Sequence, residues 1–246
     1  MKLYFQHTAG RITNVDWQYT PVYATFHESE YDKALNTGWI PHEYEEPLWF
    51  QARQVRYKLK ELEFVKAHKI PARIDFEIVD DLKNWDKYLE IWNTYLQKKN
   101  FPLTFDLSDL FKVNPESKSI IELYDYDEMV AFSIIRNKPG PVSLQFAWTY
   151  HEPKLSLGTH CQYFELHYLK DSGFEYNYVC PGYEKTCIWK SRFPGFEFWT
   201  GSTWSRDKTL YRKLCEIDSS ISNVDELDNI DYLPLEMTPN KYMEWS

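Results

Sequence analysis

Hydrophobic and polar residues follow two different periods along this chain, and each period predicts one kind of element. Between Asn84 and Lys99, large apolar residues recur every three or four positions, which is the spacing of one face of an α-helix. Three later segments have the composition of β-strands and are separated by short turn sequences. Short connections favour antiparallel pairing. These strands are expected at residues 119–124, 129–136 and 142–150.

A glycine turn and a second helix follow the three strands. The segment Thr159–Gln162 has the sequence of a capping box, and Gly173 is a typical helix stop. The pattern predicts three further elements: a strand at 174–179, a strand at 22–26, and a short helix that starts at 29–32 and stops at Gly38.

A cationic strand is predicted between these regions. Residues 54–60 alternate between polar and apolar side chains, which is the period of a half-buried strand. The polar positions are Gln54, Arg56, Lys58 and Lys60, and the apolar positions are Val55, Tyr57 and Leu59. One face of this strand is therefore expected to be apolar and the other cationic.

The order of the predicted elements indicates the fold class. A helix, three antiparallel strands, a glycine turn, a helix and a strand follow one another as in the GNAT acyltransferases, in which the last two strands splay apart and the substrates meet in the gap. The expected class is α+β, with a GNAT-like acyltransferase fold and a small amino-terminal α/β module. The expected domains are that module at 1–70, the GNAT-like transferase domain at 71–215 and an acidic carboxyl-terminal tail at 216–246.

The charge of the chain is unevenly distributed. The net charge is −9, but residues 216–246 hold eight acidic residues and one lysine, which leaves −2 for residues 1–215. Residues 51–73 carry a local charge of +5. An acidic protein is a poor general ligand for nucleic acid, yet this basic band would fit phosphates on a nearly neutral body.

Composition narrows the class of protein further. Hydrophobic residues make up 43% of the 246 residues and aromatic residues 18%, enough for a folded core. No apolar run reaches the roughly 18 residues of a membrane span, and no secretion signal is recognisable, so a cytoplasmic location is expected.

The spacing of the four cysteines predicts neither zinc nor a disulfide framework. No histidine is paired with Ser or Cys at a catalytic spacing.

Part of the sequence resembles a known enzyme family. Ser156–Thr159 before a helix, the tyrosine-rich Tyr176–Val179, and Trp189–Pro194 followed by Glu197 resemble the carboxyl half of the aminoacyl-tRNA–protein transferases, which include the arginyltransferase and the bacterial leucyltransferase. The resemblance implies a cytoplasmic enzyme whose co-substrate is aminoacyl-tRNA and whose acceptor is a protein or peptide. No further cofactor, no metal and no membrane partner are expected.

The amino-terminal part matches that family less fully. Gly38–Trp39 and Val55–Arg56 resemble its amino-terminal module. That module commonly carries cysteine pairs, whereas the first cysteine of this chain is Cys161. A metal or cluster is therefore not expected there.

Aminoacyl transfer requires an amine to lose a proton and attack an ester carbonyl while the oxyanion is stabilised. In this scheme Glu197 would accept the proton, and Lys190 and Arg192 would bind an acidic side chain or phosphates. The catalytic residues expected are Glu197, Tyr178 and Lys190. The substrate-binding residues expected are Arg192, Tyr183, Glu184, Trp148, Ser156, Leu157, Gly158, Thr159, Arg53 and Arg56.

Each of these assignments has a structural alternative. Glu197 and Arg192 could form an ion pair that only supports the fold, the tyrosines could belong to the core, and the basic strand could be a solvated face. Gly158 could serve only a tight turn. At the level of function, an acyl-CoA-dependent N-acetyltransferase and a catalytically inert GNAT-like binding domain stay open.

Overall fold

The computed structural model describes residues 2–5, 22–42, 47–51, 54–64, 69–80, 82–100, 106–179, 185–200 and 202–218. The chain divides into two compact units. We call residues 59–177 the central unit, and residues 1–58 together with 178–246 the terminal unit.

The central unit contains an antiparallel sheet in the order β9-β8-β7-β6. Its strands are β6 (Ile74–Val79), β7 (Lys118–Asp125), β8 (Glu128–Arg136) and β9 (Val142–Trp148). The three predicted strands and their antiparallel pairing are confirmed. The pattern analysis missed β6, an edge strand whose central residues 75–77 are exposed, although its apolar residues Ile74, Phe76 and Ile78 alternate with Asp75 and Glu77.

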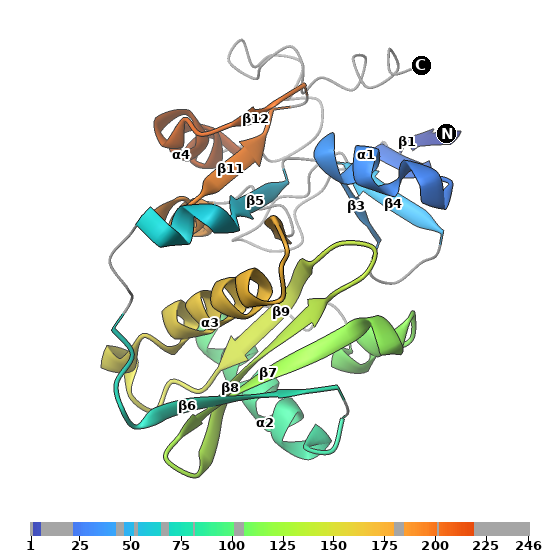
Figure 1. The fold of residues 1–246 in the computed structure, drawn as a ribbon. Coiled ribbons are helices and arrows are strands. Elements are labelled where there is room, and N and C mark those ends of the chain that lie inside the picture. Colours follow the sequence, from blue (N-terminus) through green and yellow to red (C-terminus); the bar gives the residue numbers. More distant parts are fainter. Residues whose placement is uncertain are drawn as a thin grey trace. The chain divides into compact units, whose positions relative to one another are not determined.

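Two long helices cover opposite faces of this sheet: α2 (Trp85–Lys99) and α3 (Leu157–Asp171) (Figure 1). Successive strand residues point to opposite faces. On β8, Phe132 belongs to the apolar cluster of α2, whereas the neighbouring Ser133 donates to Glu165 of α3. Helix α3 is followed by β10 (Tyr176–Val179). The order from α2 to β10 is the predicted one, so the α+β, GNAT-like fold is confirmed.

The two helices begin and end for identifiable reasons. The predicted helix at 84–99 is α2, which ends at Asn100 in the left-handed region, with φ of 55°. Helix α3 starts at Leu157, so the predicted capping box at 159–162 is wrong. The amide of Thr159 donates to the carbonyl of Ser156 at 2.8 Å, which places Thr159 within the first turn. Gly173 ends the helix as predicted, with φ of 85°.

The terminal unit contains one sheet in the order β1-β2-β4-β3 and a run of strands in the order β12-β11-β5. Its helices are α1 (Tyr31–Asn36) and α4 (Lys208–Asp218), and three-residue and eight-residue 3-10 helices cover 28–30 and 185–192. The strands are β1 (Lys2–Phe5), β2 (Val22–Thr25), β3 (Trp39–Pro41), β4 (Leu48–Gln51), β5 (Val55–Lys58), β11 (Phe196–Trp199) and β12 (Trp204–Ser205). The predicted strand at 22–26 and the helix that stops at Gly38 are confirmed.

The predicted cationic face of the 54–60 segment is only partly confirmed, since Lys60 is exposed and Lys58 half-buried. Strand β5 covers only Val55–Lys58 and pairs antiparallel with β11, and a 3-10 helix occupies 59–64. Gln54 and Arg56, on the supposedly solvated side, are buried. The approach of the two strands is close: a Cβ on Gly195 would lie 2.2 Å from the carbonyl oxygen of Lys58.

The compact units differ from the segments 1–70 and 71–215 expected as domains. Pairing of β5 with β11 joins residues that lie far apart in the sequence, so the terminal unit combines both ends of the chain. The boundary at Asn177–Tyr178 lies within β10, where the predicted gap between splayed strands would lie; that gap stays a prediction. Among the described residues, no helix is long and apolar enough to cross a membrane.

Candidate functional site

The predicted site residues fall into two groups, one in each unit. The central unit holds Trp148, Ser156, Leu157, Gly158 and Thr159, and the terminal unit holds Arg56, Tyr178, Lys190, Arg192 and Glu197. Arg53, Tyr183 and Glu184 lie outside the described residues.

In the terminal unit, Glu197 is held by two arginines. Its Oε2 accepts from Arg56 Nε at 2.7 Å, and its Oε1 accepts from Arg206 Nε at 3.0 Å. The side chains of Glu197 and Arg56 are each 8% exposed. The guanidinium of Arg56 also lies over the ring of Trp204, 4.1 Å from its centroid. Both carboxylate oxygens are therefore engaged by cations, which favours a structural ion pair over a free proton acceptor.

The other predicted residues of this unit have different environments. Lys190 is 7% exposed, and its backbone carbonyl accepts from the Tyr57 hydroxyl at 3.2 Å. Tyr178 is buried, with its ring 6.1 Å from that of Trp204. Arg192 is exposed and is not a partner of Glu197, so the expected Arg192–Glu197 pair is replaced by Arg56 and Arg206.

In the central unit, Trp148 and the start of α3 come together. Trp148 is the last residue of β9, and its indole packs on Gly158, so that a Cβ at Gly158 would lie 2.8 Å from the Trp148 Cη2 atom. The first amides of a helix have no acceptor within the helix, and the side chain of Ser156 does not cap α3. Donors at the amino end of α3 thus lie next to an aromatic ring.

Aromatic side chains and one ammonium group surround Trp148. Tyr95 belongs to the buried cluster of α2, and Trp148 and Tyr150 are partly buried against that cluster. The ring of Trp148 lies 4.8 Å from that of Tyr95, 5.6 Å from that of Phe146 and 5.4 Å from that of Tyr150. The Lys99 Nζ lies 5.4 Å from the centroid of Trp148, within the range of a cation–π interaction. We call Tyr95, Lys99, Phe146, Trp148 and Tyr150 the aromatic patch.

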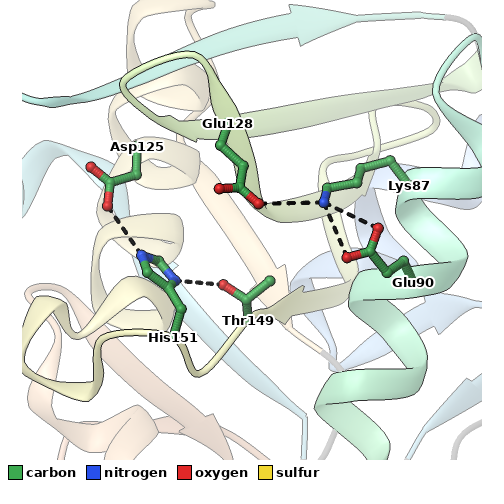
Figure 2. A network of polar contacts seen from close by, with 6 residues as sticks. All are labelled: Lys87, Glu90, Asp125, Glu128, Thr149 and His151. Carbon is green, nitrogen blue, oxygen red and sulfur yellow. Dashed lines mark hydrogen bonds and ion pairs between the residues drawn. The ribbon is translucent and has the colours of Figure 1, made fainter.

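A chain of polar contacts begins directly after Trp148 (Figure 2). The Thr149 Oγ1 lies 2.8 Å from His151 Nδ1, and His151 Nε2 lies 3.1 Å from Asp125 Oδ2. Asp125 ends β7, so the fold brings together two segments that are 24 residues or more apart. We call Thr149, His151 and Asp125 the polar triad.

Further charges surround the triad. Arg73 forms ion pairs with Asp125, at 3.1 Å, and with Glu152. Figure 2 also shows a separate network in which Lys87 of α2 contacts Glu90, at 3.1 Å, and Glu128, at 3.6 Å. The carboxylates near the triad are thus balanced by an arginine.

Asp125, His151 and Glu152 also have the donor types of a metal site. Within the described residues, one ligand atom from each lies within 4.8 Å of the others. Two carboxylates and an imidazole suit several divalent ions. However, the guanidinium of Arg73 contacts both carboxylates and supplies the positive charge that a metal would bring, so these residues fit an ion pair better than a resident metal.

Sequence reasoning missed the polar triad. Only Ser and Cys were expected as catalytic partners of a histidine, whereas His151 contacts a threonine two residues before it. The Thr-x-His spacing directly after a predicted strand was the available signal. Asp125 could not be found in this way, because its proximity to His151 depends on how β7 and β9 are placed in the sheet.

The contact between Trp148 and Gly158 provides a direct test of this geometry. Alanine favours a helix over glycine by about 1 kcal/mol, but the added methyl group would overlap the indole. We expect Gly158→Ala to lower the free energy of unfolding by about 1–3 kcal/mol, measured by urea denaturation. In a Trp148→Leu background the same change should become stabilising; a destabilisation of equal size in both backgrounds would contradict the packing described.

Comparisons with known proteins give no family assignment. No profile of a protein family matches the chain, and no curated protein does. Similar solved structures include a carboxyl-terminal domain assigned to a lysylphosphatidylglycerol synthetase of Agrobacterium fabrum, with 14% identity, a TM-score of 0.41, and coverage of 66% of this chain and 54% of that chain. A GCN5-related N-acetyltransferase of Kribbella flavida has 10% identity, a TM-score of 0.39, and coverage of 53% and 48%. The L-PGS of Bacillus licheniformis has 14% identity, a TM-score of 0.40, and coverage of 63% and 52%.

These are similarities of fold alone. The chain spans about half of the length of these three solved chains, and at such values the similarity carries no argument about activity or ligands. None of the three is an arginyltransferase or a leucyltransferase, so membership in that family stays a prediction.

Proposed function

We propose that this chain is an acyltransferase of GNAT-like fold that transfers an amino acid from aminoacyl-tRNA to an amine. The expected acceptor is the amino terminus of a protein or peptide. The observation that carries the proposal is the aromatic patch beside the uncapped start of α3, with Lys99 over Trp148. Aromatic rings stack on nucleotide bases, and a helix amino end and a lysine attract phosphate.

The packing of Gly158 favours a tRNA end over acyl-CoA as the donor. A glycine loop that binds a pyrophosphate needs its backbone open to the phosphates. Here the indole of Trp148 covers the position where a side chain of Gly158 would be. The glycine therefore serves the packing of an aromatic ring, which argues against a pyrophosphate-binding loop and so against acyl-CoA as the donor.

Contacts to the phosphates of the acceptor stem need exposed cations, and β5 does not supply them. Arg56 is buried against Glu197. Within the described part of the 53–60 segment, Lys58 is half-buried and Lys60 is exposed.

Binding and transfer assays test the donor. In a gel-shift titration we expect tRNA to bind with an affinity that falls as salt rises, and we expect CoA binding to be too weak to measure. Labelled amino acid should move from aminoacyl-tRNA to a peptide with a free amino terminus. Tight CoA binding with acyl-CoA-dependent acetylation would replace this proposal by an N-acetyltransferase. Partner binding without any transfer would favour the inert binding domain.

A pair of variants separates stacking from general damage to the surface. Trp148→Leu should weaken tRNA binding by about tenfold or more, because a base–aromatic stack contributes about 1–3 kcal/mol. Trp148→Phe keeps an aromatic ring and should retain most of the affinity. Equal losses in the two variants, or no loss in either, would contradict a stacking role for Trp148.

A further inference from the structure

We propose that the polar triad, Thr149, His151 and Asp125, is the proton relay of the transfer reaction. This inference rests on the proposed function and extends it, since it assigns the group that removes the proton of the acceptor amine. None of the three residues was among the site residues expected from the sequence.

The hydrogen bonds fix the direction in which the relay works. An ionised carboxylate can only accept hydrogen bonds, so His151 Nε2 donates a hydrogen bond to Asp125 Oδ2 at 3.1 Å. In neutral imidazole the other nitrogen is then an acceptor. The Thr149 hydroxyl therefore donates a hydrogen bond to His151 Nδ1 at 2.8 Å. Two successive hydrogen bonds thus link a hydroxyl, a base and a group that orients the base. The same succession occurs around activated hydroxyl groups in enzymes.

The position of the triad connects it to the proposed donor surface. Thr149 follows Trp148 directly, and its backbone amide donates to the carbonyl of Val130 at 2.8 Å, which holds this residue against β8. The imidazole is 40% exposed, whereas Asp125 is 11% exposed. The base is thus accessible, and the group that orients it is largely buried.

The charged groups around His151 come from several elements. Asp125 lies at the end of β7, Arg73 precedes β6 and pairs with Asp125, and Arg73 also pairs with Glu152, which follows His151. Because Arg73 forms ion pairs with Asp125 and Glu152, Asp125 can accept the hydrogen bond from His151 Nε2 without leaving an uncompensated negative charge beside the imidazole.

The proposed step conserves every proton. The amine nitrogen attacks the ester carbonyl carbon, and its proton moves to Thr149 Oγ1 while the hydroxyl proton of Thr149 moves to His151 Nδ1. The bond between the carbonyl carbon and the ribose oxygen then breaks. The leaving ribose oxygen takes a proton back through the same hydroxyl from the imidazolium. An amide has formed, an ester has been cleaved, and the triad returns to its initial state.

Variants at Thr149 provide the sharpest test. Valine has nearly the shape of threonine without the hydroxyl, and serine keeps the hydroxyl. Thr149→Val and His151→Gln should lower the transfer rate at saturating substrates by about 10²–10⁴-fold, as for loss of a general base, with tRNA affinity unchanged. Thr149→Ser should retain most of the rate.

A donor without tRNA separates failure of the relay from failure of the proposed function. The same variants are assayed with an aminoacyl p-nitrophenyl ester and a peptide amine. Dependence on Thr149 and His151 with this ester, but no transfer from tRNA, would retain the relay and overturn the tRNA donor. Rates that equal the native rate with both donors, or losses explained by a lower free energy of unfolding, would overturn the relay and leave the triad as a support of the β7–β9 edge. Absence of aminolysis in the native protein with both donors would overturn both proposals.

Discussion

Replacing Glu197 by alanine is expected to lower the free energy of unfolding by about 3–5 kcal/mol. Breaking a buried ion pair costs this much because one charge stays in a poorly solvated place without its counter-ion. Arg56 would lose the acceptor that lies 2.7 Å from its Nε. Its side chain is 8% exposed, so water could not replace the carboxylate without a rearrangement. Urea denaturation of the purified protein measures the effect.

Two controls distinguish this explanation from a general loss of packing. Arg206 binds the same carboxylate but is 56% exposed, so Arg206→Gln should cost less than about 1 kcal/mol. The double variant Arg56→Met with Glu197→Leu removes both buried charges and should recover most of the stability. Native stability in Glu197→Ala, together with loss of transfer, would instead restore Glu197 as the proton acceptor expected from the sequence.

The second large effect is a dependence of stability on pH that arises from Glu165. This carboxyl group is fully buried on α3, and burial raises its pKa from 4.5 to about 7. Hydrogen bonds from Ser133, Ser143 and Gln162 act in the opposite direction but do not compensate for the loss of solvent. Because the pKa is higher in the folded protein than in the unfolded chain, the folded protein is the better proton binder. The contribution of Glu165 to the free energy of unfolding is therefore complete below pH 4.5 and is lost as the pH rises through about 7.

Glu165→Gln should remove this dependence. A pKa difference between 4.5 and about 7 corresponds to about 3 kcal/mol. Glutamine has the shape of the protonated glutamate, so the variant should resemble the native protein at pH 4.5 and exceed it by about 3 kcal/mol in stability at pH 8. The measurement is urea denaturation across this range. The control is Glu77→Gln, at an exposed position of β6; a variant curve parallel to the native one at Glu165 would contradict this account.

The local sequence pattern correctly predicted those elements in which the buried side chains recur with the period of the apolar residues. Helix α2 buries the residues that recur every three or four positions, including Tyr88, Trp92 and Leu96. The strands β7 and β8 are almost fully buried, yet their turns and their β-branched and aromatic content were sufficient to place them. Gly173, at φ of 85°, was recognisable because a side chain is strained there.

The same reasoning failed where a distant segment supplied the environment. Alternation in 54–60 indicated a solvated cationic face, because a charged residue in a strand normally faces water. Strand β11 changes this by bringing Glu197 to Arg56 across 141 residues of sequence. A buried arginine with a carboxylate partner and an exposed arginine have the same local sequence, so no periodicity could distinguish them.

The linear order of residues was enough to predict helix α2, the antiparallel strands β7, β8 and β9, and the helix and strand that follow a glycine turn after Trp148. Each of these depends on contacts between near neighbours in the chain. Only the tertiary structure decided that Trp148 covers Gly158, that Glu197 faces two arginines, and that Asp125 reaches His151. Those contacts depend on the register and packing of separate segments, which burial and charge compensation select in the folded protein as a whole.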